Sequence, residues 1–280
     1  MTKSANIQRE IRMRKAVAAG QYIFLSITAI LSIFPFAWII IGATNVSKDI
    51  TMGKLTFGNQ LANNFNKLIQ AGDVWLCFKN SAILALIITV TSMLVCSLAG
   101  YGFVVFRNRM KDRFFSLILL SMMIPTSSLM VPLFRMFSKM NLLNTKLGVA
   151  LPALSTAFLI FFFRQNTKSF PYETIQAARI DGLSELGIFF RIYMPMMKST
   201  YSAAAIITFM SSWNNYMWPL VSLQTKDQRT LPLLISSLGS AYTPDYGIIM
   251  VGIIITTIPS ALVFFLMQKS FVEGMMGSVK

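Results

Sequence analysis

The chain has 280 residues, of which 55% are hydrophobic and only 12% are charged. A soluble domain carries roughly 25% charged residues, so the composition excludes an ordinary soluble protein and favours an integral membrane protein. The chain contains no histidine. A metal site with histidine ligands and a catalytic site built on a histidine base are therefore excluded within it.

Six uncharged windows are each long enough to cross a bilayer as a helix, which takes roughly 17–25 residues. The windows cover residues 16–47, 80–106, 114–134, 147–163, 199–225 and 246–268. We therefore expect an all-α, polytopic membrane protein with six transmembrane helices. The first window is longer than a signal-peptide core and lacks a clear cleavage pattern, so we expect a retained helix, interrupted at Pro35. Pro125, Pro132 and Pro152 mark breaks or kinks in the third and fourth spans.

The basic residues predict the orientation. The net charge is +15, but the basic residues are distributed along the chain and not gathered in one domain, so we expect no nucleic-acid partner. Sixteen of the 25 lysine and arginine residues lie in the N-terminal tail, in the loops 107–113 and 164–198, and in the C-terminal tail. By the positive-inside rule, both termini and these loops are expected to be cytoplasmic.

The segments between the spans differ in character. Residues 43–79 form an asparagine-rich outer segment that we expect to be a solvated loop, with Asn64 among its polar residues. The outer segment 223–246 holds an uncharged stretch that is too short to span a bilayer, so we expect a folded surface or re-entrant segment with a potential external partner.

The cytoplasmic loop 164–198 predicts two short helices. Pro171 suits the first turn of a helix that the Asp181-Gly182 pair ends. A second amphipathic helix is expected from about Ser184 until Pro195 breaks it. Together they predict a compact knob on the cytoplasmic face, suited either to docking a partner or to lying flat on the membrane.

Several motifs carry a resemblance to a known family. The run Gln176 to Gly182, followed by Pro195, resembles the EAA loop of ABC-importer permeases. The sequences Met123-Ile124-Pro125, Leu142-Leu143-Asn144-Thr145, Trp213 to Leu220 and Phe271-Val272-Glu273-Gly274 with Val279-Lys280 are similar to signatures of sugar permeases. These motifs cover most of residues 95–280, and the chain most resembles MalG-like permease subunits of carbohydrate ABC importers.

This resemblance implies a type I ABC importer permease fold, with a cytoplasmic tail at 1–20 and a transmembrane domain at 21–280. It implies a second permease subunit, two ATP-binding subunits, an extracytoplasmic solute-binding protein and a sugar substrate, in the cell membrane. The residues implied to couple to the ATPase are Glu173, Gln176, Ala177, Ala178, Asp181, Gly182 and Pro195. The motif usually opens with glutamate where this chain has Gln176; Glu173, one helical turn earlier, is a hypothetical substitute for that charge.

Polar and aromatic residues in the fifth span are candidates for the translocation path. These residues are Ser212, Trp213, Asn214, Asn215 and Tyr216. Amides and hydroxyls within a span face protein or water, and aromatic rings stack on sugars, but helix–helix contacts and an aromatic belt explain the same pattern.

Two other classes of protein remain as alternatives. An ion-coupled secondary sugar carrier needs intramembrane carboxylates, and the six windows contain none. A membrane enzyme needs a metal cluster or a nucleophile with its base, and most of these need histidine. The sequence has no phosphate-binding loop, so ATP is expected to be hydrolysed on a partner. Cys77 and Cys96 have neither disulfide nor metal-ligand spacing, and no cofactor is expected.

Overall fold

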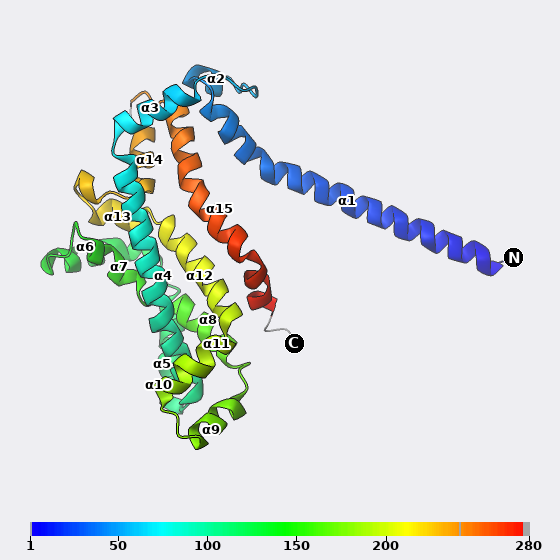
Figure 1. The fold of residues 1–280 in the computed structure, drawn as a ribbon, viewed down its shortest axis with the longest axis vertical. Helices are drawn as coiled ribbons and strands as arrows, with labels where there is room; N and C mark the ends of the chain where they lie inside the picture. The colour runs from blue at the N-terminus through cyan, green and yellow to red at the C-terminus, as the bar shows by residue number, and fades with distance from the viewer. Residues whose placement is uncertain (1, 241, 277–280) are drawn as a thin grey trace. The chain divides into compact units, whose positions relative to one another are not determined.

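The computed structural model describes the backbone of residues 2–240 and 242–276 and the side chains of residues 13–240 and 242–269. Within these ranges the chain is helical and has no strand, which confirms the all-α prediction (Figure 1). The side chains of the basic residues before position 13 and of the C-terminal motif Phe271–Gly274 with Val279–Lys280 lie outside the described residues. The elements are α1 (Thr2–Ala43), α2 (Ser47–Thr51), α3 (Leu61–Ala71), α4 (Val74–Val105), α5 (Arg109–Ser121), α6 (Thr126–Lys139), α7 (Lys146–Ala150), η1 (Leu151–Ala153), α8 (Ala157–Thr167), α9 (Tyr172–Ile180), α10 (Glu185–Ile188), η2 (Phe189–Tyr193), α11 (Met194–Met196), α12 (Lys198–Trp213), α13 (Met217–Ser222), η3 (Lys226–Gln228), α14 (Leu231–Gly239) and α15 (Tyr246–Met276).

The chain forms two compact units. The smaller unit contains residues 1–70 and 241–254, and the larger contains residues 71–240 and 255–280. Of the three boundaries between them, the last, at residues 254–255, falls within α15.

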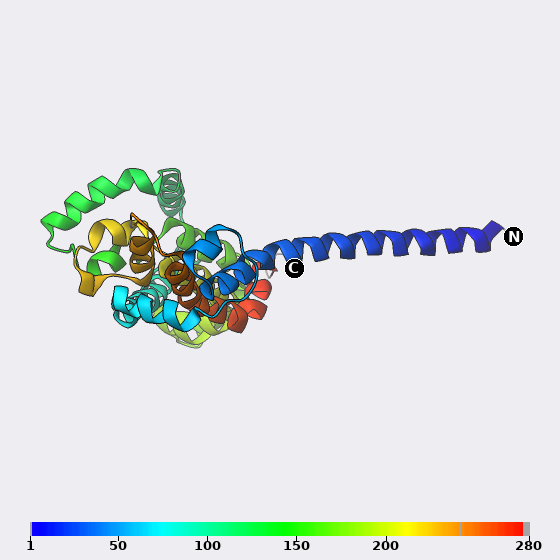
Figure 2. The same ribbon diagram turned by 90° about the horizontal axis from the view of Figure 1, so that it is seen from above.

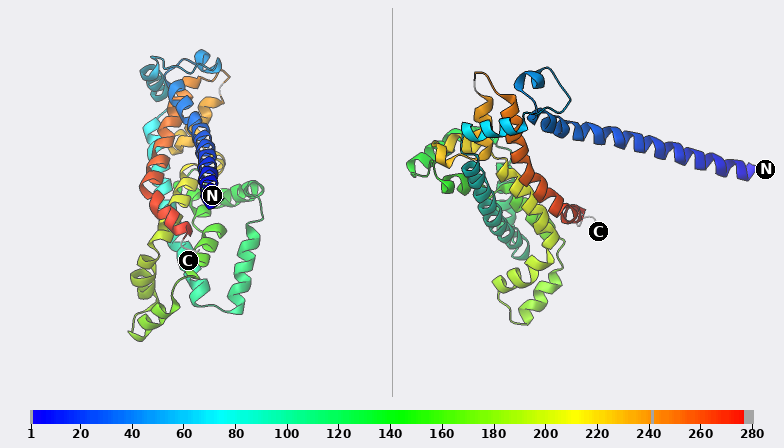
Figure 3. Two further views of the ribbon diagram at one scale, coloured as in Figure 1. Left: turned by 90° about the vertical axis from the view of Figure 1, so that its right-hand side faces the viewer. Right: turned by 45° about the horizontal axis from the view of Figure 1, so that its top comes forward.

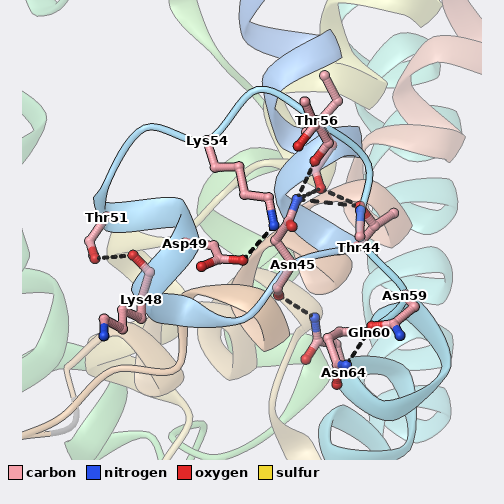
Figure 4. Close-up of polar contacts among 12 residues, drawn as sticks. Thr44, Asn45, Lys48, Asp49, Thr51, Lys54, Thr56, Asn59, Gln60 and Asn64 are labelled. Carbon is pink, nitrogen blue, oxygen red and sulfur yellow. Dashed lines mark hydrogen bonds and ion pairs between the residues drawn. The ribbon is translucent and has the colours of Figure 1, made fainter.

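A buried polar network organises the smaller unit after α1 ends (Figure 4). Asn64, on α3, is only 2% exposed and donates hydrogen bonds to the carbonyls of Ala43 and Asn45 at 2.9 Å. Asn45 in turn donates to the carbonyl of Thr56 at 2.8 Å. Asn64 thus satisfies the Ala43 carbonyl, which the end of α1 leaves without a helical partner. The expectation of a solvated loop at 43–79 was therefore wrong for this part, which folds through buried amides and contains α2 and α3.

A carboxylate joins the start of α15 to this network. Asp245 accepts hydrogen bonds from Ser47 Oγ at 2.7 Å and Lys67 Nζ at 3.3 Å. Burial acts to raise the pKa of Asp245, but the bonds from Ser47 and Lys67 outweigh burial and hold the pKa below its usual value. The negative charge of Asp245 thus helps to fix α2 and α3 around the first turn of α15.

Three helices form the centre of the larger unit. α4 packs along both α8 and α12 (Figure 1). At Gly100 an added Cβ atom would lie 2.7 Å from the Phe163 Cβ and 2.8 Å from the Arg164 backbone nitrogen, so α4 and α8 approach closely because Gly100 has no side chain. An apolar cluster around Cys96, Phe163 and Ala204 fills the junction of the three helices.

Sharp bends interrupt two of the predicted spans. α5 and α6 are bent by 101° across residues 122–125, and the bend is visible where α6 lies across the end of α5 (Figures 2 and 3). Helices 146–153 and 157–167 are bent by 44°. Pro125 and Pro152 lie at these bends, as the sequence predicted.

The six-span count is not fully confirmed. Three described helices, Met13–Ala43, Val74–Val105 and Tyr246–Lys269, are long and apolar enough to cross a membrane, and the two bent pairs raise this number to five. The predicted span 199–225 is not among them, because α12 has only 16 residues and the helix is interrupted between α12 and α13.

Prolines within helices cause fewer interruptions than expected. The prediction that Pro35 interrupts the first span was wrong, because α1 continues through it from Thr2 to Ala43. Pro132 likewise lies inside α6. A proline removes one backbone hydrogen bond, and a long helix retains enough of the others to continue beyond it.

The close approach at Gly100 yields a stability prediction. Gly100→Ala places a methyl group against the backbone of α8, so we expect the free energy of unfolding to fall by about 1–3 kcal/mol, the usual cost of overpacking. Gly102→Ala is the matched control, because an added Cβ at Gly102 meets no atom within 4 Å. Thermal unfolding of the two purified variants in one detergent measures the difference. Equal stability of the two variants would contradict the proposed contact.

Candidate functional site

The predicted helix in the loop 164–198 is confirmed as α9 (Tyr172–Ile180). Pro171 precedes its first turn, and Glu173 lies within that turn, near the positive end of the helix dipole. Gly182 ends the helix with a φ of 81°. The amides of Gly182 and Leu183 donate to the carbonyls of residues 179 and 178, which is the hydrogen-bond pattern of a Schellman motif. The Asp181-Gly182 pair therefore stops α9 as the sequence predicted.

The two faces of α9 differ sharply. Glu173, Gln176 and Ala177 are exposed, as are Asp181 and Gly182 beyond its end. Ile180, an apolar side chain that the sequence analysis did not single out, is 87% exposed.

Ala178 does not lie on that exposed face. It is 4% exposed and packs, with Ile175, inside the larger unit. Its small side chain allows α9 to pack against its own chain, and the implied role of Ala178 in coupling stays a prediction. Helical spacing alone places Ala177 and Ala178 about 100° apart, so one faces outward and the other inward.

An aromatic cluster attaches α9 to the rest of the larger unit. Tyr101 of α4 packs with its ring centroid 4.9 Å from that of Tyr193, in a T-shaped arrangement. Phe189 stacks on Tyr193 at 5.3 Å. Thr167 gives its hydroxyl hydrogen to the carbonyl of Phe163, so the Tyr193 hydroxyl donates to Thr167 Oγ1 across 2.6 Å. Helices α4 and α9 thus contribute to one buried core with these aromatic rings, and the Thr167 hydroxyl connects the end of α8 to it.

A polar link reinforces this attachment. Arg179 Nε donates to Glu185 Oε1 at 2.6 Å, and the Tyr101 hydroxyl donates to Glu185 Oε2 at 3.4 Å. The contact with Glu185 raises the pKa of the Arg179 guanidinium further above its usual value. The pair is partly exposed, so its contribution to stability is small; its effect is to fix the orientation of α9 relative to α4.

The second predicted helix of the loop is present but continues past Pro195. Ser184 caps α10 by accepting from the Gly187 amide at 3.2 Å, and the chain then runs through the π-helical segment η2 into α11. The expectation that Pro195 breaks the helix was wrong; the helical path ends at Met197. A π-helical turn has wider hydrogen-bond spacing, which accommodates a proline just after it.

A cavity of about 610 Å³ lies where three broken helices meet in the larger unit. Its walls come from the α5–α6 bend, from the η1–α8 bend and from the break between α12 and α13. The lining residues are Pro125, Thr126, Ser127, Met130, Leu133, Val149, Pro152, Ala153, Thr156, Asn215, Met217 and Trp218. The volume falls within the range of about 300–1,000 Å³ that small-molecule sites occupy.

A second cavity of about 210 Å³ shares Ala153, Thr156 and Asn215 with the first. Neither lining contains an ionisable side chain. The polar groups in these linings are hydroxyls and the Asn215 amide, and the remaining walls are apolar. This surface suits an uncharged polar ligand better than an ion, because a charge in such surroundings would lack a counter-ion. Among the described residues, no group of acidic or cysteine side chains is placed to hold a metal ion.

The predicted path residues of the fifth span separate into two sets. Asn215 lines both cavities, and Ser212 lines the smaller one. Tyr216 lies beside the larger cavity without lining it, and its hydroxyl accepts from Ser236 at 3.1 Å. Asn214 is exposed and its amide donates to the Met210 carbonyl at 2.9 Å.

Trp213 is buried in the larger unit and lines neither cavity, and its place in a path stays a prediction. It is 1% exposed, and its Nε1 donates to the carbonyl of Thr256 at 2.9 Å. Its ring packs against Phe78 and Phe209. A buried tryptophan with a satisfied N–H joins helices and exposes no surface for a ligand.

Most residues that line the larger cavity were not predicted from the sequence. Thr126, Ser127 and Thr156 lie beside the helix breaks at Pro125 and Pro152, and the prolines were the signal for this position. The analysis also missed the role of Asn144, whose side chain accepts from the amides of residues 224 and 225 at 3.1 Å and so connects two loops.

Comparison with known proteins agrees with this architecture. Residues 92–276 match the family of binding-protein-dependent transport system inner membrane components. The chain belongs to this family. It is 51% identical to the lactose transport system permease protein LacG of Rhizobium radiobacter over 260 residues, which is 93% of this chain and 95% of that protein.

More distant relatives extend the comparison. The chain is 33% identical to the arabinooligosaccharides transport system permease protein AraQ of Bacillus subtilis, covering 92% of this chain and 94% of the relative. It is 31% identical to the sn-glycerol-3-phosphate transport system permease protein UgpE of Yersinia pestis, covering 96% and 100%. A crystal structure of a bacterial ABC transporter involved in import of the acidic polysaccharide alginate shares the fold, with a TM-score of 0.82, 20% identity and coverage of 93% and 98%.

These matches confirm the predicted family and the ABC importer permease fold. The chain is a multi-pass permease of the inner membrane and not an enzyme, and importers of this family work with a binding protein and a separate ATPase.

The buried contacts of Trp213 predict an effect of its substitution on stability. Trp213→Phe removes the hydrogen bond to α15 and part of a packed ring, so we expect the free energy of unfolding to fall by about 1–3 kcal/mol. Trp75→Phe is the control, because Trp75 is 59% exposed. Thermal unfolding in detergent is the measurement. A Trp213→Phe variant as stable as the Trp75→Phe variant would contradict the structural role.

Proposed function

We propose that this chain is one of two permease subunits of an ATP-driven importer that carries a neutral sugar, with the closest fit to a disaccharide or short oligosaccharide. The observation that most supports this proposal is the uncharged cavity where the three helix breaks meet. Relatives named for lactose and for arabinooligosaccharides support a neutral sugar. The relative named for sn-glycerol-3-phosphate handles an anion, and the absence of a basic side chain in the two linings disfavours that cargo here.

The interrupted helices around the cavity support a role for it in transport. Backbone without helical hydrogen bonds is tolerated within a membrane where it lines a cavity, and transporters place substrate sites at such breaks. Asn215 and Thr156 offer hydrogen bonds to sugar hydroxyls, and Trp218 and the prolines offer apolar surface to the sugar C–H faces. The second permease subunit would complete the path.

The exposed face of α9 is the proposed contact with the ATPase. It presents Glu173, Gln176 and Ala177 together with the highly exposed Ile180. An exposed aliphatic side chain beside small and polar ones suits insertion into a cleft on a partner. The Arg179–Glu185 pair and the aromatic core would then pass the movement of α9 directly to α4 and α8.

The mechanism that follows is alternating access. ATP binding closes the ATPase subunits, which moves α9 and favours an outward-open permease; hydrolysis returns the permease to the inward-facing state. Each ligand shifts this equilibrium only by its different affinity for the two states. The distribution of basic residues supports a cytoplasmic position for both termini and α9. The loaded binding protein would dock on the opposite side, in part on residues 223–246.

The alternative of an ion-coupled sugar carrier has little support in the described residues. Proton or sodium coupling needs a carboxylate within the membrane. The six uncharged windows contain no carboxylate. Asp245, directly before the last window, accepts from Ser47 and Lys67, and Asp112, in the first turn of α5, accepts from two arginines.

A substitution at Glu173 tests the ATPase contact. We expect Glu173→Gln to lower sugar-stimulated ATP hydrolysis by the reconstituted importer several-fold, because the variant removes the acid nearest to Gln176. Asp49→Asn, which neutralises a partly exposed acid on α2 that pairs with Lys54, should leave the rate unchanged. Unchanged hydrolysis in Glu173→Gln would reject Glu173 as the charge that replaces the usual glutamate.

Two neighbouring asparagines test the path. Asn215→Ala removes the amide that lines both cavities, so we expect sugar uptake into proteoliposomes to fall roughly tenfold, as for the loss of one or two hydrogen bonds. Asn214→Ala is the matched control, since Asn214 lies outside both linings. Equal uptake by the two variants would place the path elsewhere.

A further inference from the structure

The short loop after α4 and the first turns of α5 carry positive charge that the described part of the chain does not neutralise. Residues 107–113 include four basic side chains and one acid, Asp112. Asp112 accepts from Arg107 Nε at 3.0 Å and from Arg164 Nη2 at 2.8 Å, so each carboxylate oxygen already has an arginine partner. Arg109 and Arg113 are exposed and have no ion-pair partner among the described residues.

Arg164 fixes this segment against α8. Its side chain is only 12% exposed, and its guanidinium carbon lies 3.9 Å from the centroid of the Phe115 ring. Phe115 and Asp112 both belong to α5, so the contact holds the first two turns of α5 in place. Arg113 is two residues from Phe115, which puts it about 200° around the helix and on the outward side.

Apolar side chains continue the outward face along α5. Leu117 and Leu120 are 61% and 57% exposed. Their spacing from Arg109 and Arg113 keeps all four in one stripe of the helix. With a rise of about 1.5 Å per residue, Leu120 lies about 16 Å along the axis from Arg109. That length is close to half of the roughly 30 Å hydrocarbon core of a bilayer.

We infer that this stripe, made of Arg109, Arg113, Leu117 and Leu120, binds an anionic phospholipid. The two arginines bind the phosphate of the headgroup, because a guanidinium matches phosphate oxygens in a bidentate geometry. The two leucines contact an acyl chain. The stripe lies at the same end of α4 as α9, since Arg179 of α9 lies over the ring of Phe106, so the lipid belongs to the leaflet on that side.

A lipid fits this face better than an acidic protein surface does. An acidic partner would match the arginines but would leave the leucines, which extend into the apolar part of a predicted span, without a role. The inference does not depend on which sugar is carried.

Native mass spectrometry of the purified importer complex tests the site. The complex is incubated with an equimolar mixture of phosphatidylglycerol and phosphatidylcholine, and the lipids that remain bound are counted. We expect wild type to retain phosphatidylglycerol in preference to phosphatidylcholine. Arg109→Gln/Arg113→Gln should reduce this preference about 25-fold, since each of the two basic residues near an anionic surface favours binding by a factor of roughly five. Arg109→Lys/Arg113→Lys keeps both charges and should retain most of it.

Arg135→Gln/Lys139→Gln is the matched control. It removes two exposed basic residues at the same spacing on α6, so we expect it to behave as wild type. Equal phosphatidylglycerol retention by the wild type and the Arg109→Gln/Arg113→Gln variant would overturn the inference. Loss of the ATPase subunit from that variant with unchanged lipid retention would overturn it in favour of a protein contact.

Discussion

The packing of Tyr101 against Tyr193 is the interaction on which the functional account depends. It joins α4, the longest helix of the larger unit, to the loop that carries α9, and the hydrogen bond from Tyr193 to Thr167 adds α8 to the same core. Burial raises the pKa of Tyr193, so its hydroxyl stays protonated as a donor at neutral pH. A force on α9 therefore acts on two helices that also form the region around the cavities.

The two candidate sites are connected through α8. Its C-terminal end holds Thr167 in the aromatic core, and its N-terminal end begins at the bend that lines both cavities with Thr156. Gly100 allows α4 to lie directly on the backbone of α8 between these points. The close-packed interface permits little sliding, because a packed interior transmits displacement instead of absorbing it. This continuity supports a short mechanical path from α9 to the cavity.

The sequence predicted local features well where one residue type determines the backbone. Gly182 stops α9 through its positive φ, and Pro125 marks a real bend. It predicted less well where the outcome depends on partners distant in sequence. The burial of Ala178, implied to couple to the ATPase, and of Trp213, a candidate for the path, was not predicted. Ala178 packs in one cluster with Ile175, and Trp213 packs against Phe78 and Phe209. The cavity itself needs three segments between residues 125 and 218, and no local pattern reports their meeting.

Site-specific cross-linking on α9 tests the central claim most directly. A photo-activated amino acid is placed at Ile180, which is 87% exposed, or at Ile175, which is 1% exposed, in cells that express the whole transport system. The account predicts an adduct with the ATPase subunit from position 180 and none from position 175. Absence of an ATPase adduct at position 180, in complexes that still contain the ATPase, would contradict the assignment of α9 as the coupling surface.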